Sequence, residues 1–224
     1  WIFGNPPKIL FFKNHLRNLI SSLTKYKIKK KSLRKDIVKT INKNLSKKIS
    51  YNHLLRVAIN KKIISISLRK RLSPKFDFTL KFIDLKRDKP EYKNLKYKKI
   101  LSYLKKIDNS KSDIGIMNQG KVLETGTSNL LFFKDKKVFT PKKNYYQGNT
   151  YKYFRSKIKK IIKKDIFLKK LNEYDEILLL GSGKGVTSVK TINQINWRRK
   201  SLRNYKIFTR HYKLAIKNCA TYKF

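Results

Sequence analysis

The first half of the chain shows the two spacings of apolar residues that distinguish helices from strands. Apolar positions three or four residues apart predict helices over residues 15–25 and 32–47, with Ser32 as the N-cap of the second. Short runs rich in β-branched residues predict strands, two of which form a hairpin across the polar residues 60–62. These strands are expected at residues 53–59, 63–69 and 78–85. The mixture of helices and strands is typical of an α+β fold.

Short strands dominate the second half. A polar, proline-containing segment, residues 86–99, precedes them and is the expected domain junction. A short helix is predicted over residues 100–107, a basic amphipathic helix over 150–164 and a C-terminal helix from about Tyr205. The expected strands lie at residues 113–118, 121–124, 129–134, 137–140 and 175–180.

The balance of charge and the cysteine content narrow the classes of function. The 224 residues include 58 Lys and Arg but only 13 Asp and Glu, which gives a formal net charge of +45 and argues against a neutral secreted module. One cysteine, Cys219, excludes an internal disulfide framework and a cysteine-based zinc cluster. No run of about 18 apolar residues occurs, so no transmembrane helix is expected. Because the chain starts at Trp1 rather than Met, we expect a fragment that lacks its true N-terminus.

The excess of cations suggests nucleic acid as a partner, because clustered cations release counterions from phosphates. Only 11 of the 58 cationic residues are Arg, however, and the other 47 are Lys spread along the whole chain. Arg is the residue that contacts phosphates and bases through two parallel hydrogen bonds. The scattered Lys therefore favour solvated surfaces over a nucleic-acid site. A basic RNA-binding protein of ribosomal type is the alternative from another class.

Residues 181–189, GSGKGVTSV, follow an apolar run and form the densest Gly-containing motif. A P-loop would need Gly at Leu178 and Ser or Thr at Gly185, so that motif is absent. Backbone N–H groups and the Ser182 hydroxyl at the end of a strand would still suit a phosphate. The alternative is an ordinary tight turn.

Glu124 opens a polar step, residues 124–129, between two predicted strands. A carboxylate placed among apolar strands needs a partner, because burying an unpaired charge is costly. The alternative is an exposed acid in a turn. The three His and the sparse Asp and Glu have no spacing typical of metal ligands, and no Ser-His-Asp set can be assembled from them.

Three segments of the second half resemble the class IV family of pyridoxal-phosphate enzymes, which includes branched-chain aminotransferases, D-amino-acid aminotransferases and aminodeoxychorismate lyases. Residues 114–141, IGIMNQGKVLETGTSNLLFFKDKKVFTP, are similar to the family's strand, Gly turn, acidic residue, T-S-N step and hairpin. Residues 148–154, GNTYKYF, are similar to its G-I-T-R helix start. Residues 174–192, YDEILLLGSGKGVTSVKTI, are similar to its D-E-V-F-x-x-G-T-x-x-G segment. The order and spacing of the three agree.

The resemblance implies a mixed α/β (α+β) fold with two domains. Residues 1–86 are expected to form a small N-terminal α+β domain that is incomplete at its start. Residues 87–224 are expected to form a larger, β-rich C-terminal domain with helices, which binds the cofactor.

The resemblance also implies roles for particular residues. The family's Schiff-base lysine lies in a K-x-L-N step, which implies Lys93, with Lys96 as the rival. Glu124 matches the acid that pairs with the pyridine nitrogen of the cofactor, and Tyr97 matches an aromatic or basic position that contacts it. Contacts with the cofactor phosphate are implied for Asn149, Thr150, Ser182 and Gly183.

Some positions depart from the family pattern. Asn18 stands where the family has its phosphate-binding Arg, and Arg17 lies one residue earlier, about 100° away around a helix. Either Arg17 reaches the phosphate, a nearby Lys replaces it, or phosphate binding is weakened. Tyr151 and Ser188 replace an Arg and a Pro of the pattern.

The function implied is that of an enzyme that uses pyridoxal 5'-phosphate, acts as a homodimer in the cytoplasm and uses Lys93 as a base and acid. Shortened loops favour aminodeoxychorismate lyase, which releases pyruvate and leaves 4-aminobenzoate for folate synthesis. A branched-chain or D-amino-acid aminotransferase is the alternative. The expected partners are an amino-acid or 2-oxo-acid substrate and a second copy of the chain, with no membrane or nucleic acid.

Overall fold

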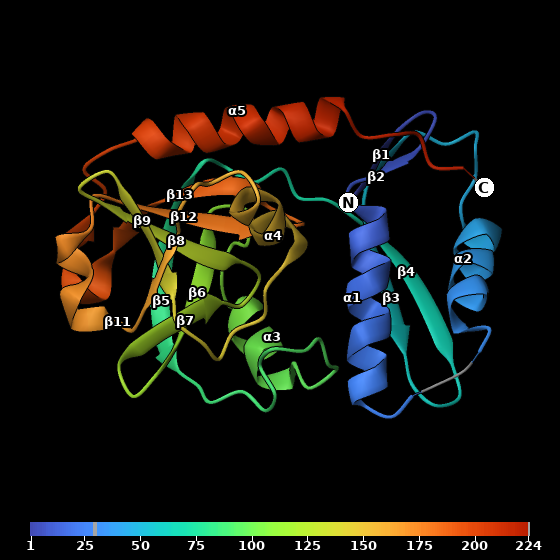
Figure 1. Cartoon of the computed structure of the whole chain (residues 1–224), viewed down its shortest axis with the longest axis horizontal. Coiled ribbons are helices and arrows are strands. Elements are labelled where there is room, and N and C mark those ends of the chain that lie inside the picture. Colours follow the sequence, from blue (N-terminus) through green and yellow to red (C-terminus); the bar gives the residue numbers. More distant parts are fainter. Residues whose placement is uncertain (29–30, 224) are drawn as a thin grey trace. The chain divides into compact units, whose positions relative to one another are not determined.

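The computed structural model describes residues 1–28 and 31–223, and the chain divides into two compact units (Figure 1). Neither unit is a single continuous stretch of the chain, because the first unit also includes two short segments from later in the sequence. The first unit contains Trp1–Arg71, Lys93–Leu95 and the segment from Ala215; the second contains Leu72–Tyr92 and Lys96–Leu214.

The second unit begins before the boundary expected after residue 86. Strand β5 (Asp77–Asp84) belongs to this unit, because it pairs in parallel with strands β6 (Ser112–Asn118) and β13 (Gly185–Ile192). A division after residue 86 would separate β5 from both partners. Phe224, the last residue of the expected C-terminal domain, lies outside the described residues.

The first unit consists of an antiparallel four-stranded sheet and two amphipathic helices. Its elements are β1 (Ile2–Gly4), β2 (Lys8–Ile9), α1 (Phe12–Lys25), α2 (Leu33–Asn44), β3 (Tyr51–Ile59) and β4 (Ile64–Lys70). The strand order is β2-β1-β3-β4, and the predicted hairpin and both predicted helices are confirmed. Leu16 of α1 and Ile37 of α2 are buried in one core with Ile59 of β3. Ser32 stands at the N-cap position of α2, but its side chain caps no backbone N–H of that helix; its hydroxyl instead donates to the Asp36 carboxylate (2.9 Å).

The second unit is built on one mixed sheet of ten strands. Besides β5, β6 and β13, its strands are β7 (Lys121–Thr125), β8 (Asn129–Lys134), β9 (Lys137–Pro141), β10 (Ile162–Lys164), β11 (Ile166–Phe167), β12 (Glu176–Gly181) and β14 (Trp197–Arg198). The order is β10-β9-β8-β12-β13-β5-β6-β7-β11, with β14 paired to β13. The helices are α3 (Lys98–Leu104), α4 (Asn149–Arg155) and α5 (Arg203–Lys217), with 3-10 turns at Leu168–Glu173 and Asn193–Ile195.

The core of the second unit lies around the middle of this sheet. All six residues of β12 are buried, as the continuous apolar run in the sequence indicates. Trp197 is also buried, and its indole N–H donates to the Tyr174 carbonyl (3.0 Å). Phe132 and Phe133 are buried in β8, so their rings pack in the core and are not exposed for stacking on the bases of a nucleic acid.

The basic helix expected over residues 150–164 is wrong beyond Arg155. Helix α4 ends there, and Ile162–Lys164 form β10, which pairs in parallel with β9 and sets Ile162 opposite Phe139. A helix through residues 159–164 would place lysines four residues apart, where like charges repel. Strand pairing avoids that repulsion and packs Ile162 against the core.

The turn expected over residues 181–189 is shorter than predicted. Strand β12 runs through Gly181, the turn is confined to residues 182–184, and β13 begins at Gly185. Gly185 has a φ of +74°, in the left-handed region that glycine adopts without strain. A Cβ atom at this position would also lie 2.6 Å from the Tyr212 ring, so glycine is required here twice over.

A buried carboxylate caps helix α5. Glu176 on β12 has no exposed surface, and its oxygens accept the backbone N–H groups of Asn204 (2.9 Å) and Tyr205 (2.6 Å). N–H groups in the first turn of a helix have no intrahelical partner, and a negative charge is favoured there. Glu176 therefore fixes the start of α5 to the central strand.

We expect Glu176→Gln to lower the free energy of unfolding by about 1–3 kcal/mol, because the substitution removes the charge that accepts these bonds. Urea denaturation measures the change. Glu173→Gln is the matched control, since the Glu173 carboxylate is exposed and 3.4 Å from Lys134, and its loss should cost under about 0.5 kcal/mol. Equal losses in the two variants would contradict the capping role.

Candidate functional site

The eight residues that the sequence predicts for the cofactor site are divided between the two units. Arg17 and Lys93 belong to the first unit, with Arg17 exposed on α1. The other six belong to the second unit: Tyr97, Glu124, Asn149, Thr150, Ser182 and Gly183.

Glu124 is a buried residue of β7 rather than an exposed turn acid. Its Oε1 atom forms an ion pair with Arg87, which follows β5 in the sequence, and the side chains are only 6% and 10% exposed. Its Oε2 atom accepts the backbone N–H of Tyr146 (3.3 Å). The carboxylate that the sequence singled out therefore has a cation and an N–H donor from two distant segments.

Arg87 connects Glu124 to Tyr97. Its second guanidinium nitrogen donates to the Tyr97 hydroxyl (3.4 Å), and its Cζ atom lies 5.5 Å from the centre of the Tyr97 ring. Tyr97 is the N-cap residue of α3, so the start of this helix is joined to the acid on β7. The planar guanidinium makes both contacts at once, which a lysine amine would not reproduce.

The loop before α4 is fixed by Asn129, the last residue of the T-S-N step. The Asn129 side-chain amide donates to the Tyr146 carbonyl (2.5 Å) and its oxygen accepts the Gly148 N–H (2.9 Å). A Cβ atom at Gly148 would lie 3.0 Å from that oxygen, so the approach is close. These bonds set the position from which Asn149 and Thr150 begin α4.

Thr150 carries a polar group that the fold does not satisfy. Its side chain is buried, and its Oγ1 atom has no hydrogen-bond partner within the described part of the chain. Buried polar groups in native proteins are almost always paired, so an orphan hydroxyl calls for an explanation such as a ligand. A phosphate oxygen at the start of α4 would provide the partner.

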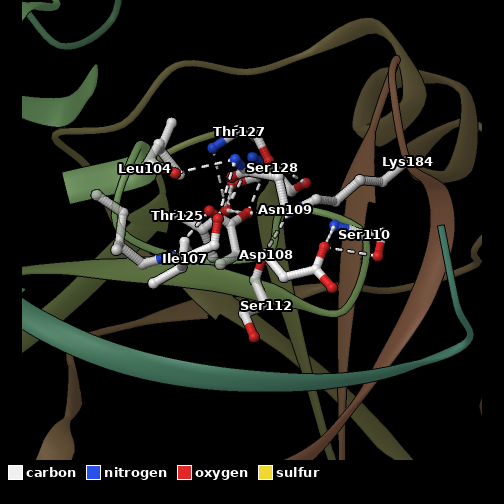
Figure 2. A network of polar contacts seen from close by, with 12 residues as sticks. Leu104, Ile107, Asp108, Asn109, Ser110, Ser112, Thr125, Thr127, Ser128 and Lys184 are labelled. Carbon is white, nitrogen blue, oxygen red and sulfur yellow. Dashed lines mark hydrogen bonds and ion pairs between the residues drawn. The ribbon is translucent and has the colours of Figure 1, made fainter. Parts of the chain in front are cut away.

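The turn between β12 and β13 carries Ser182 and Gly183 and is connected to a second buried ion pair. Lys184 is 8% exposed, and its Nζ atom lies 2.7 Å from Asp113 Oδ2. The same oxygen accepts the hydroxyls of Thr125 and Thr127, both at 2.7 Å. Figure 2 shows Lys184 reaching into this cluster, which contains the start of the loop after β7. Burial lowers the pKa of the Lys184 amine, while the charge of Asp113 opposes that shift.

In the first unit, Lys93 acts electrostatically on His15 of α1. Burial, together with the positive charges of the N-terminus and of Lys93, lowers the pKa of His15 to about 3. His15 is therefore neutral at pH 7. Next to Lys93, the Asn94 side chain donates to the Tyr26 hydroxyl (3.3 Å), which attaches this segment to the end of α1.

Sequence reasoning missed Arg87, Asn129 and Lys184 as parts of the site. The sequence carries only an indirect signal for Arg87, because a carboxylate among apolar strands needs a cation. It does not show which cation, since Arg87 is far from Glu124 in the sequence. Asn129 lay inside a motif that was noticed without a role for this residue. Lys184 was noticed only as part of a failed P-loop pattern.

Residues 1–28 and 31–223 contain no group of three or more His, Cys, Asp or Glu side chains arranged to hold a metal ion. Across the same residues, no helix combines the length and the apolar character that crossing a membrane requires.

Comparisons with known proteins assign the family. A family model described as amino-transferase class IV matches residues 2–192, and the chain belongs to this family. It is therefore a pyridoxal-phosphate-dependent enzyme of the transaminase or lyase kind. The recognition made from the three sequence motifs is confirmed. A comparison with curated proteins found no match.

Solved structures of the same fold include both kinds of enzyme. A putative 4-amino-4-deoxychorismate lyase from Legionella pneumophila is 17% identical with a TM-score of 0.74, over 96% of this chain and 89% of that one. A branched-chain aminotransferase from Thermoproteus uzoniensis is 15% identical with a TM-score of 0.73, over 96% and 83%. A hypothetical aminotransferase from Mycobacterium tuberculosis in its PLP-bound form is 15% identical with a TM-score of 0.73, over 96% and 86%. At these identities the likeness establishes the fold.

The residues of the second unit fit the cofactor. The Glu124 carboxylate is a buried acid of the kind that can accept a hydrogen bond from a protonated ring nitrogen. The unpartnered Thr150 hydroxyl and the Ser182 hydroxyl are donors suited to a phosphate. The donor set thus matches the two polar ends of pyridoxal phosphate.

We expect Arg87→Met to lower the free energy of unfolding by about 3–5 kcal/mol, because it leaves the buried Glu124 carboxylate without its cation. Thermal and urea denaturation measure the loss. Lys121→Met is the control: it breaks an exposed ion pair with Asp165 (2.7 Å), which should cost under about 1 kcal/mol. Similar losses in both variants would contradict a buried pair at Glu124.

The lowered pKa of His15 predicts a dependence of stability on pH. The unfolded state has the ordinary pKa of about 6.5 and binds the proton more readily than the folded state, so stability falls as the pH is lowered from about 6.5 toward 3. This residue contributes at most about 1.4 kcal/mol per pH unit. Urea midpoints measured between pH 4 and 7 should fall less steeply in His15→Gln than in the wild type. Parallel curves would contradict a buried, neutral imidazole.

Proposed function

We propose that the chain is an aminodeoxychorismate lyase of the class IV family, which releases pyruvate and 4-aminobenzoate in folate synthesis. The observation that best supports a cofactor-dependent enzyme is the buried Glu124 carboxylate. Arg87 forms an ion pair with it, and it accepts the Tyr146 N–H from the loop before Thr150. Support for the lyase comes from the sequence, whose shortened loops resemble that subgroup, and from the fold shared with the Legionella lyase-like structure.

Each site residue has a proposed task at a stated group. The Lys93 amine holds the cofactor covalently and, once released, moves a proton as base and acid. Glu124 holds the proton on the ring nitrogen, so that the bound ring withdraws electrons from the substrate carbon. Tyr97, whose hydroxyl accepts a hydrogen bond from Arg87 (3.4 Å), would contact the ring in this proposal.

Hydrogen-bond donors hold the phosphate in this proposal. Thr150 and Ser182 offer hydroxyls, and Asn149 and Gly183 offer backbone N–H groups. Arg17 is exposed on α1 of the first unit, and its contact with the phosphate stays a prediction from the resemblance.

The branched-chain or D-amino-acid aminotransferase is the second candidate. It is supported by the Thermoproteus structure, whose TM-score of 0.73 is close to the 0.74 of the lyase-like structure. We further propose a homodimer that works in the cytoplasm, as the resemblance implies. Sedimentation at several concentrations tests the dimer, and a lone monomer in the presence of cofactor would contradict it.

Product analysis separates the two reactions. The cofactor-loaded protein is given aminodeoxychorismate, and separately a branched-chain or D-amino acid with 2-oxoglutarate. We expect 4-aminobenzoate and pyruvate from the first mixture. Glutamate from the second mixture, without 4-aminobenzoate from the first, would assign the aminotransferase instead.

We expect Lys93→Ala to abolish the visible absorbance of lysine-bound pyridoxal phosphate, because the Lys93 amine is proposed to form that link. Absorbance spectra of the protein mixed with cofactor measure this. Borohydride reduction and peptide mapping of the wild type should place the label on Lys93.

Lys96→Ala is the matched control, since the Lys96 amine is exposed and 2.8 Å from Asp88. Its spectrum should resemble that of the wild type. Label on Lys96, or loss of absorbance in Lys96→Ala alone, would assign the covalent link to Lys96. Salt-sensitive retention on RNA with no visible band would favour the ribosomal type of protein.

A further inference from the structure

Lys184 differs from the other lysines of this chain in its surroundings. It is the one buried Lys in the part of the chain that the structure describes, although 47 Lys occur in the sequence. Its amine lies 2.7 Å from Asp113, whose side chain has no exposed surface, and 4.5 Å from the centre of the Phe78 ring. Removing the ammonium group of a lysine from water costs free energy, so we look for a role of Lys184 that an exposed lysine would not fill.

Asp113 joins Lys184 to the loop after β7. Its Oδ2 atom accepts the Lys184 amine and the hydroxyls of Thr125 and Thr127, and its Oδ1 atom accepts the Ile114 N–H (2.8 Å). Four bonds fill the capacity of a carboxylate. The Thr125 hydroxyl in turn accepts the Ser128 N–H (2.8 Å), so the shape of the loop is fixed from this one acid.

The turn that follows β12 is held to this loop at both of its ends. At one end, Gly181 lies so close that a Cβ atom would be 2.6 Å from the Ser128 hydroxyl and 2.9 Å from the Thr127 carbonyl. At the other end, Lys184 enters the Asp113 cluster (Figure 2). Ser182 and Gly183, which stand between the two attachments, are thus fixed on both sides.

Stability alone does not account for the pair. Replacing a buried ion pair with apolar residues of similar volume is often neutral or stabilising. A filled set of directional bonds instead fixes one geometry, and donors held in place before binding avoid the cost of ordering a loop around a ligand.

We propose that Lys184 and Asp113 are positioning residues for the phosphate-binding turn, and that their pairing sets how tightly the chain holds the phosphate of pyridoxal phosphate. The proposal rests on the proposed function, because it takes Ser182 and Gly183 as phosphate donors. Neither Lys184 nor Asp113 touches the cofactor in this account. They act through the turn and the loop.

The test compares pyridoxal phosphate with pyridoxal, which lacks the phosphate. Equilibrium dialysis of the full chain gives a Kd for each compound. The Kd for pyridoxal divided by the Kd for pyridoxal phosphate reports the contribution of the phosphate. We expect Lys184→Met to lower this ratio about tenfold or more, as loss of a charged hydrogen bond does, and to leave the Kd for pyridoxal within about twofold.

Lys184→Met alone leaves a buried carboxylate without its cation, and the variant can fail to fold for that reason. The double variant Asp113→Asn, Lys184→Met removes both charges and keeps an acceptor for the two threonines. It should fold and show the same tenfold fall. Lys190→Met is the control, because Lys190 is on β13, the strand that follows the turn, is 60% exposed and lies 3.7 Å from Asp77.

The outcomes are distinguishable. An unchanged ratio in the double variant, or an equal fall in Lys190→Met, would overturn the positioning role and leave the proposed function standing. If the wild type bound neither compound, the proposed function would fail and this inference with it. A merely structural role would lower stability and leave the ratio unchanged.

Discussion

A carboxylate buried in a protein interior must find cations or N–H donors there, because removing it from water costs several kcal/mol that only such partners offset. The second unit buries three of the chain's 13 acids, and each joins segments that are distant in sequence. Glu176 attaches α5 to the central strand, Glu124 attaches Arg87 and the loop before α4 to β7, and Asp113 attaches the turn after β12 to the loop after β7. Two of the three junctions lie at the candidate site.

Local pattern predicts much of the fold because the sheets are built from hairpins and apolar runs. The β3–β4 and β8–β9 hairpins and the buried β12 follow from alternation, turn residues and continuous apolar character. Strand β10 does not, because its lysine-rich sequence has a helical spacing of apolar residues and only its pairing with β9 makes it a strand. The placement of β5 in the second unit likewise depends on parallel pairing with β6 and β13, which no local signal specifies.

The candidate site divides in the same way. The motif around Glu124 and the T-S-N step identified the acid and the loop from their order in the sequence, and the structure places Glu124 in a buried strand. Arg87 and Lys184 could not be predicted, because each pairs with an acid 37 or 71 residues away, and 58 candidate cations compete for 13 acids. In so basic a chain, sequence shows which acid needs a partner but not which cation provides it.

The few buried acids fix the geometry of the second unit more than the many lysines that produce the net charge. Most lysines lie on solvated surfaces, where each contributes little, whereas the few acids with cationic partners inside the second unit hold its loops in place. A substitution of any single exposed lysine therefore changes the field of the molecule slightly, but loss of Asp113 or Glu124 removes a junction that several segments share. A positive field of this kind attracts anions at low ionic strength. Geometry at the site comes from the buried acids, and attraction comes from the exposed lysines.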